Sequence, residues 1–241
     1  MSGITDVAEG SALKLIDTLK KAAGVLRDED LPYALAGGAA AYARGAMPPT
    51  HDVDFVIREA DADAAARAFR ARGMRVEIPP EGWLIKAYDD GRMIDLIFRL
   101  SGHLDTQTVL GRAEEINVEA VPMPVLTATD LVIAWLASFS EHHADFAGAL
   151  SCVRPLREQV DWSRVRAETA GSAFATAFLV LLRELRILTS EEEKDEGRRL
   201  WGIPTAGALQ VLVKEVWQAT APDQPQESPA PAAEPKEPAV Q

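Results

Sequence analysis

The sequence is poor in cysteine, with Cys152 as the only one among 241 residues. One thiol can form neither an intrachain disulfide framework nor a zinc site that needs several thiolates. The N-terminus also lacks a basic start followed by an apolar segment, so no signal peptide is expected. These absences favour the reducing cytoplasm, and we expect a cytoplasmic location.

Long apolar runs and basic charge are also scarce. The longest apolar runs, near residues 131–139 and 173–182, are about half of the ~20 residues that a membrane span requires. The formal net charge is −12, whereas proteins that coat nucleic acids carry a basic footprint. We therefore expect no membrane partner and no general DNA binding, although a local basic patch stays possible.

The apolar content is sufficient for a folded core, because 47% of the residues are hydrophobic. Apolar periodicity predicts a helix over residues 6–26. Helix-forming residues followed by a glycine predict two more, over 39–45 and 59–72. Strands are expected within 31–36, over 52–57 and 74–78, and in a hairpin over 83–100 that turns at Asp90–Gly91. Residues 116–126 read as one last extended segment, and the following segment as a helix capped by Thr127 or Thr129.

This order of elements predicts an α+β fold, in which a small mixed β-sheet flanked by helices is followed by a helical bundle. We place the α/β domain at residues 1–126 and the helical domain at 127–217, with the functional cleft between them. Residues 191–199 form a charged, solvated run. Residues 218–241 are mostly Pro, Ala, Glu and Gln, a composition that predicts a disordered tail.

Three aspartates stand in segments that otherwise favour burial. Asp52 and Asp54 occupy "DVDFVI", where alternation places both side chains on one face of the strand. Asp95 lies in "RMIDLIFRL", between large apolar residues. An isolated ionised carboxylate there is costly, so we expect it to pair with a cation, bind a metal or shift its pKa.

The hairpin places a cation near the third acid. If the turn is symmetric about Asp90–Gly91, Lys86 lies opposite Asp95 and on the same face. Two interpretations of Lys86 stay open with similar weight. It forms a structural ion pair with Asp95, or it contacts a phosphate while Asp95 meets a metal or a nucleophile.

Three converging carboxylates repel one another, by roughly 4 kcal/mol for two charges ~4 Å apart at an effective dielectric of about 20. A divalent cation removes this penalty, and oxygen ligands suit Mg²⁺, which also binds substrate phosphates. Gly37 and Gly38 precede these acids and open a predicted helix. They allow backbone N–H groups to approach a phosphate closely, at the positive end of that helix. The sequence therefore predicts a cradle for a triphosphate and a metal ion.

These motifs resemble the nucleotidyltransferase superfamily of the polymerase-beta type. Its pattern is an apolar strand ending in Gly-Gly or Gly-Ser, a helix, Asp-hydrophobe-Asp, and a third acid on a later strand. "LAGGAA", "THDVDFVI" and "RMIDLIFRL" match it in order, with thirteen residues between Gly38 and Asp52. The likeness covers about residues 31–100. Among small bacterial members, the chain looks most similar to the abortive-infection, toxin-like and antibiotic-modifying proteins.

The resemblance implies Mg²⁺-dependent transfer of a nucleoside monophosphate from an NTP, such as ATP, to an acceptor, with release of pyrophosphate. Asp52, Asp54 and Asp95 would be the metal-binding and catalytic residues, and Asp95 would position or deprotonate the acceptor hydroxyl. Gly37 and Gly38 would contact the triphosphate, together with Thr50 and Lys86. The acceptor, a small molecule, a protein or an RNA, is not specified.

One position departs from the family pattern. Many small relatives carry Arg-x-Thr-x-Asp before the first acid, whereas this chain has Pro48 at the arginine position and keeps Thr50. Lys86 or Arg44 would then substitute for the missing cation, or the protein would bind nucleotides for regulation without catalysis. A further alternative is the toxin component of a toxin–antitoxin pair, with an antitoxin as partner.

Other charged residues have simpler interpretations. His142, His143 and Asp145 lack an evident fourth ligand, so an exposed helix end is expected rather than a metal site. His51 is expected to be a turn residue, and Asp130 to favour a helix N-terminus. Of the arginines at 154, 157, 164 and 166, we expect at least half on a solvated face and the others toward the cleft.

Overall fold

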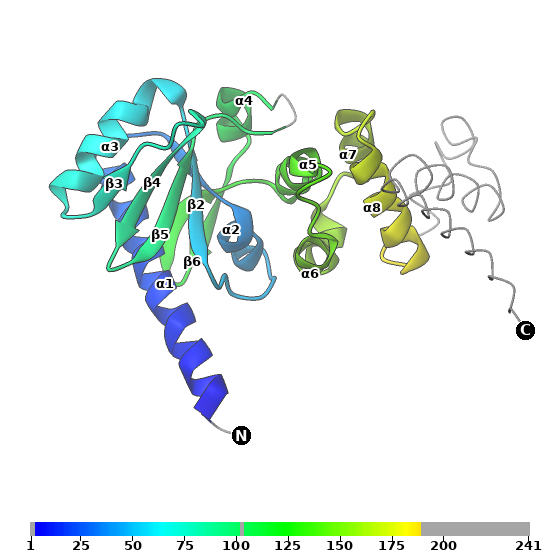
Figure 1. Cartoon of the computed structure of the whole chain (residues 1–241), viewed down its shortest axis with the longest axis horizontal. Helices are drawn as coiled ribbons and strands as arrows, with labels where there is room; N and C mark the ends of the chain where they lie inside the picture. Colours follow the sequence, from blue (N-terminus) through cyan, green and yellow to red (C-terminus); the bar gives the residue numbers. More distant parts are fainter. Residues whose placement is uncertain (1–2, 102–103, 189–241) are drawn as a thin grey trace, which may run out of the picture. The chain divides into compact units, whose positions relative to one another are not determined.

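The computed structural model describes residues 3–101 and 104–188, with side chains described from residue 13 onward. All of the described residues belong to one compact unit. The described part contains a seven-stranded sheet with the order β3-β4-β5-β2-β1-β7-β6, together with eight α-helices (Figure 1). The expected α+β class with a mixed sheet is confirmed.

The strands are β1 (Tyr33–Ala36), β2 (Asp52–Ile57), β3 (Arg75–Glu77), β4 (Leu84–Asp89), β5 (Arg92–Ile97), β6 (Glu114–Val118) and β7 (Val121–Val125). The α-helices are α1 (Gly3–Asp28), α2 (Gly37–Ala43), α3 (Ala62–Ala71), α4 (Thr106–Gly111), α5 (Ala128–Ser138), α6 (Phe146–Leu156), α7 (Trp162–Glu168) and α8 (Ala173–Glu184). Two short 3₁₀ helices, η1 (Glu59–Asp61) and η2 (Arg157–Gln159), complete the described elements.

The sheet is mixed because its central strand β2 has neighbours of opposite sense. It runs parallel to β5 and antiparallel to β1, and β1 in turn pairs in parallel with β7. The hairpin over 83–100 forms as predicted, with β4 and β5 joined by Asp90–Gly91, both at positive φ. The parallel pairing of β2 with β5 brings residues 41 positions apart in sequence, such as Asp54 and Asp95, side by side at the centre of the sheet.

The segment expected to be one extended run is a second hairpin, β6–β7. Its turn residues Glu119 and Ala120 adopt positive φ angles of 48° and 68°. Neither is a residue type that favours this conformation, so the turn could not be predicted from its residue types. Pro122 and Pro124 of β7 also lack the backbone N–H that would donate a hydrogen bond within a sheet, so the sequence did not indicate an inner strand here.

One face of the sheet is closed by a hydrophobic core. Helices α1 and α3 pack against each other and against the sheet, and Leu19, Leu26, Phe55 and Phe69 are fully buried in the shared hydrophobic core. Asp89 at the end of β4 fixes α1 to this layer. Its carboxylate accepts hydrogen bonds from Thr18 (2.9 Å) and Lys21 (2.7 Å). Because alternate strand residues point to opposite faces, Asp52 and Asp54 lie on the face away from Phe55.

The helical part begins at α5, which Thr127 caps through a hydrogen bond to the backbone N–H of Asp130 (3.1 Å). Three phenylalanines hold this part together: Phe139 at the C-cap of α5, Phe146 of α6 and Phe178 of α8, with ring centroids 5.3–5.8 Å apart. The boundary at residue 126 stays a prediction. The charged run at 191–199, the end of the helical domain at 217 and the tail at 218–241 lie outside the described residues.

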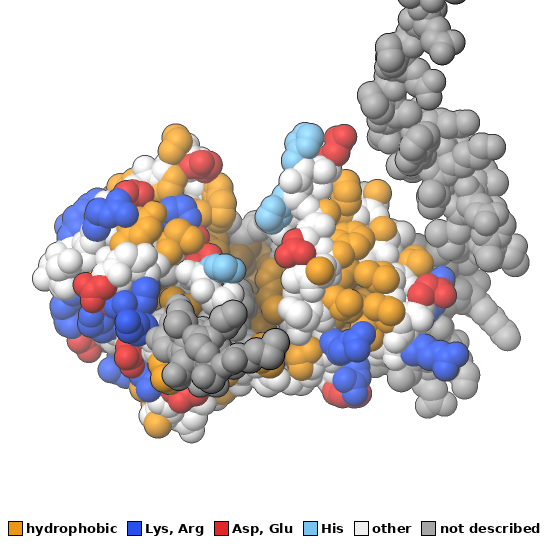
Figure 2. Space-filling view, turned by 60° about the horizontal axis from the view of Figure 1, so that its bottom comes forward, with side chains coloured by type: hydrophobic (Ala, Val, Ile, Leu, Met, Phe, Trp, Pro, Cys, Tyr) orange, Lys and Arg blue, Asp and Glu red, His pale blue; other side chains and the backbone are white. Residues whose placement is uncertain are grey.

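No helix in the described ranges combines the length and apolar character needed to cross a membrane. On the face drawn in Figure 2, basic side chains are interspersed with acidic ones and form no continuous stripe. Many of the described arginines are already paired with acids, including Arg58 with Asp61 and Arg72 with Asp28. The expected lack of general nucleic-acid binding stays a prediction.

Candidate active site

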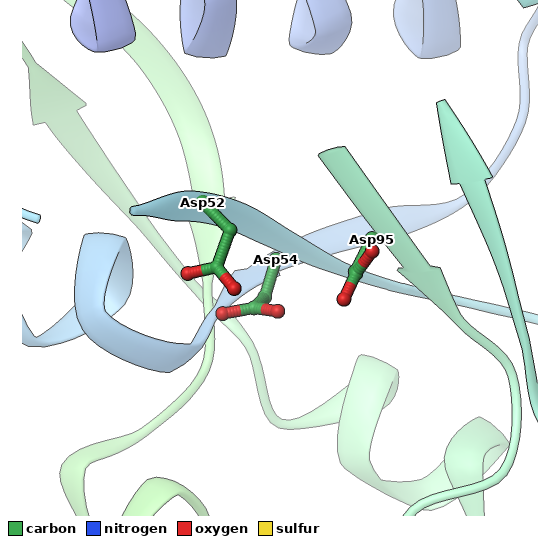
Figure 3. Close-up of side chains that lie close together, drawn as sticks. All are labelled: Asp52, Asp54 and Asp95. Carbon is green, nitrogen blue, oxygen red and sulfur yellow. The ribbon is translucent and has the colours of Figure 1, made fainter. Parts of the chain in front are cut away.

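The three predicted acids come from two neighbouring strands. Asp52 and Asp54 lie on β2, and Asp95 lies on β5. The parallel register places Asp54 directly beside Asp95. Figure 3 shows all three carboxylates on the same side of these strands, pointing toward one another. The predicted shared face of Asp52 and Asp54 is therefore present, and Asp95 joins it.

The carboxylates are close enough to share one cation. Each offers an oxygen that lies within 4.8 Å of an oxygen from the other two. Asp52 and Asp54 are partly exposed, whereas Asp95 is buried. In the part of the chain that the structure describes, no other group of three or more acids, histidines or cysteines converges in this way.

These residues belong to a row that crosses the sheet. Strand pairing aligns Ala36 with Asp54, Asp54 with Asp95, Asp95 with Lys86, and Lys86 with Glu77. The Lys86 ammonium donates to both Asp95 oxygens, at 3.1 Å each. The predicted register of the hairpin and the Lys86–Asp95 pair are confirmed. The structure shows the ion pair; whether Lys86 also contacts a phosphate stays a prediction.

The electrostatics of the site favour a bound cation. Burial, together with the nearby charges of Asp52 and Asp95, raises the pKa of Asp54 to about 7. Burial also raises the pKa of Asp95, although the hydrogen bond from Lys86 opposes this change. Both shifts express the cost of holding negative charge at one partly dehydrated point. A divalent ion with oxygen ligands would remove that cost, so the donor set fits Mg²⁺.

The pKa of Asp54 predicts that ion binding depends on pH. A carboxyl with a raised pKa keeps its proton up to about pH 7, so the ligand-free fold loses stability as the pH rises from 4 to 7. Ion binding must displace this proton, and the apparent affinity should fall about tenfold for each pH unit below 7. Mn²⁺ titrations between pH 5.5 and 8.5 would measure this. A flat profile would contradict the assignment.

Gly37 is required where β1 passes into α2. Its φ is +55°, and a Cβ added there would lie 1.8 Å from the Asp54 Oδ2 atom. A side chain at this position would therefore collide with a predicted ligand carboxylate. Gly38 is different, because its added Cβ would meet nothing nearer than Pro49, at an ordinary 3.8 Å. A side chain is therefore excluded at position 37, whereas a Cβ at position 38 makes only ordinary contacts.

Gly37→Ala is expected to disturb the ion site formed by the three acids, whereas Gly38→Ala should leave the ion site intact. The first change adds positive-φ strain of about 1–3 kcal/mol and forces the Asp54 carboxylate to move. Urea unfolding and Mn²⁺ titration of both variants would measure the difference. Equal Mn²⁺ affinities for Gly37→Ala and the wild type would show that the close contact with Asp54 is not important.

Thr50 and the residues before it form the turn between α2 and β2. Thr50 and His51 are exposed, and Pro49 is buried. Arg44, one suggested substitute for the missing arginine, is engaged elsewhere. Its guanidinium donates to the Leu126 carbonyl (2.6 Å) and the Glu114 carboxylate (2.8 Å). Of the two suggested substitutes, only Lys86 is therefore beside the acids.

The remaining charged candidates lie outside this cluster. His142 and His143 are in an exposed loop between α5 and α6, not on a helix, and Asp145 caps α6 by accepting from the Gly148 N–H (2.9 Å). This local cap explains why the acid is found there.

Asp130 does more than favour a helix N-terminus. It is fully buried and accepts hydrogen bonds from Arg112 (2.6 Å) and Arg164 (2.5 Å). The local part of this arrangement was visible in the sequence, because Thr127 and Asp130 have the spacing of a capping box. The two arginines approach from segments 18 and 34 residues away in sequence, so local pattern alone could not identify them.

Comparison with known proteins places the chain in a family. The model of a family described as "Uncharacterised nucleotidyltransferase" matches residues 1–192. The chain belongs to this family and is an enzyme of the nucleotidyltransferase class. Its class of reaction is the transfer of a nucleoside monophosphate from a nucleotide. None of the proteins with curated descriptions matches the sequence.

Solved structures with a similar fold include two antibiotic nucleotidyltransferases. The antibiotic-resistance factor ANT(2'')-Ia has a TM-score of 0.49 and 15% identity, over 72% of this chain and 98% of that chain. The lincosamide adenylyltransferase LnuA has a TM-score of 0.43 and 11% identity, over 57% and 92%. A nucleotidyltransferase-like protein from Paracoccidioides brasiliensis has a TM-score of 0.47 and 16% identity, over 77% and 94%.

Proposed function

We propose that the protein is a Mg²⁺-dependent enzyme that transfers a nucleoside monophosphate from an NTP to a hydroxyl-bearing acceptor. The observation that carries the proposal is the convergence of the Asp52, Asp54 and Asp95 carboxylates within 4.8 Å. Strand pairing imposes this convergence, although it raises the pKa values of Asp54 and Asp95. Charge held together at such a cost is typical of functional sites.

In this proposal, Asp52, Asp54 and Asp95 hold Mg²⁺, which when bound neutralises charge on the phosphate oxygens. Two groups of protein atoms receive the triphosphate. The backbone of Gly37 and Gly38 approaches it closely, since no side chain intervenes. Lys86 supplies a cation and Thr50 a hydroxyl from the turn before β2.

The reaction is an in-line displacement at the α-phosphorus. The acceptor oxygen forms the new bond to phosphorus, and the bond from the α-phosphorus to the bridging oxygen breaks. Pyrophosphate leaves with that electron pair. Asp95, on the separate strand β5, accepts the proton of the acceptor hydroxyl or orients the hydroxyl for attack, the role that the family resemblance implies for the third acid.

Thermal unfolding with Mg²⁺ and each of the four NTPs tests nucleotide binding. At least one NTP should raise the melting temperature, because a ligand that binds only the folded state stabilises it. Transfer is then followed with labelled NTPs and a panel of acceptors: tRNA, protein, an aminoglycoside and a lincosamide. A protein that responds to none of the nucleotides would refute the proposed function.

A further inference from the structure

We propose that Lys86 controls when Asp95 becomes available to the site. In the nucleotide-free protein, Lys86 holds both oxygens of Asp95, so that the first ion is bound mainly by Asp52 and Asp54. When a nucleotide binds, Lys86 exchanges Asp95 for the triphosphate and releases that carboxylate. This inference rests on the proposed function and adds an order of events to it.

The geometry of the pair supports the first half of the exchange. Lys86 contacts the two Asp95 oxygens equally, at 3.1 Å, so neither oxygen is left without the cation. Among the described residues, Lys86 is the only one that forms a salt bridge with Asp95. With this pair formed, the formal charge of the four residues Asp52, Asp54, Asp95 and Lys86 is −2, which one divalent ion balances.

The neighbouring strand β3 does not hold Lys86 in an ion pair of its own. Glu77 is its register neighbour on the other side, but Glu77 is bound by Arg75 and by the Tyr88 hydroxyl (3.2 Å). The Arg75 guanidinium also stacks on the Tyr88 ring, 3.9 Å from its centroid. The second carboxylate that could compete for Lys86 is thereby already satisfied.

A second Lys–Asp pair in this chain shows the contrast. The Lys21–Asp89 pair is surrounded by Thr18 and Arg92, both of which also contact Asp89. Lys86 and Asp95 have no such additional partners in the described residues beyond the Met93 sulfur, 3.4 Å from the ammonium. The Lys86 side chain is also 28% exposed. A lone, partly hydrated pair can exchange when a more highly charged anion arrives.

The test is a double-mutant cycle on Mn²⁺ affinity in the full-length protein, at pH 8.5 and without nucleotide. In the wild type, Asp95→Asn should change the Mn²⁺ Kd by less than about threefold, because Lys86 already occupies Asp95. With Lys86→Met, the freed carboxylate joins the ion site, and Asp95→Asn should then weaken Mn²⁺ binding about tenfold or more.

The second arm measures nucleotide binding at saturating Mg²⁺ with the NTP that stabilises the protein most. Lys86→Met should weaken binding about tenfold or more, whereas Lys21→Met serves as the matched control and should change neither affinity. Circular dichroism confirms that each variant is folded.

Two results would overturn the inference. One is an equal effect of Asp95→Asn in the wild-type and Lys86→Met backgrounds, and the other is an unchanged nucleotide affinity in Lys86→Met. Failure of the proposed function itself is recognised separately. In that case, Mn²⁺ binding is absent from the wild type or survives in Asp52→Asn/Asp54→Asn.

Discussion

Replacing Asp52 and Asp54 together by asparagine should abolish nucleotidyl transfer while leaving the fold intact. Asparagine keeps the size of each side chain but removes two negative charges from the cluster. If metal stabilisation of the transition state is worth several kcal/mol, the rate should fall by about 10³-fold or more. Binding of Mn²⁺ should be lost in parallel.

The fold should survive because the charges of this pair oppose folding more than they support it. The pKa of Asp54 is raised to about 7 by burial and by its acidic neighbours. The neutral amides remove this repulsion, so the variant should be at least as stable as the wild type in the absence of ions. Urea unfolding in EDTA measures stability, and pyrophosphate release measures transfer.

Glu158→Gln is the control, because it removes one carboxylate from the surface by the same Asp/Glu-to-amide change. Its side chain is 75% exposed and pairs only with Arg157 in the described residues, so activity should not change. If Asp52→Asn/Asp54→Asn kept substantial transfer activity, the catalytic centre would have to lie elsewhere in the chain.

The second large effect is expected on stability, from Asp130→Ala. Asp130 of α5 is fully buried and pairs with Arg112, at the C-cap of α4, and with Arg164 of α7. Removing it leaves Arg112 without its carboxylate partner among the described residues, leaves Arg164 with Glu168 alone, and creates a small cavity. Loss of one partner from such a pair costs about 3–5 kcal/mol. Urea unfolding at pH 7 would detect this change, with Glu158→Gln again as the surface control.

Asp130 should also make stability sensitive to acid. Burial raises its pKa, but hydrogen bonds from Arg112 and Arg164 outweigh this effect and hold the pKa below its usual value. The stabilisation is therefore complete above the unfolded-state pKa of about 4 and is lost as the pH falls through the lower folded-state pKa. Asp130→Ala should remove part of this acid dependence. If Asp130→Ala lowered the free energy of unfolding by less than about 1 kcal/mol at pH 7, the freed arginines would have to be solvated by water instead.

Much of the site was accessible from sequence because it is built on strands with regular alternation. The period of two placed Asp52 and Asp54 on one face, and the Asp90–Gly91 turn fixed the pairing of Lys86 with Asp95. Placing Asp95 beside this pair needed more information than the alternation of one strand. It required β2 and β5 to be neighbours, which follows from the family pattern and not from either segment alone.

Other features could not be predicted from the local sequence pattern. Arg44 looked available for a phosphate, yet it binds the Leu126 carbonyl and Glu114, residues 82 and 70 positions away. The turn between β6 and β7 places Glu119 and Ala120 in conformations that their types do not favour. Gly37 was expected to admit a phosphate, whereas the structure shows that it also makes room for Asp54.

The contact between Gly37 and Asp54 links two positions of the chain genetically. Any larger residue at 37 demands a shorter or displaced side chain at 54, since both would occupy the same volume. Laboratory evolution that starts from an alanine at position 37 should therefore recover function by reversion, or by compensating changes in strand β2, before it alters distant surfaces.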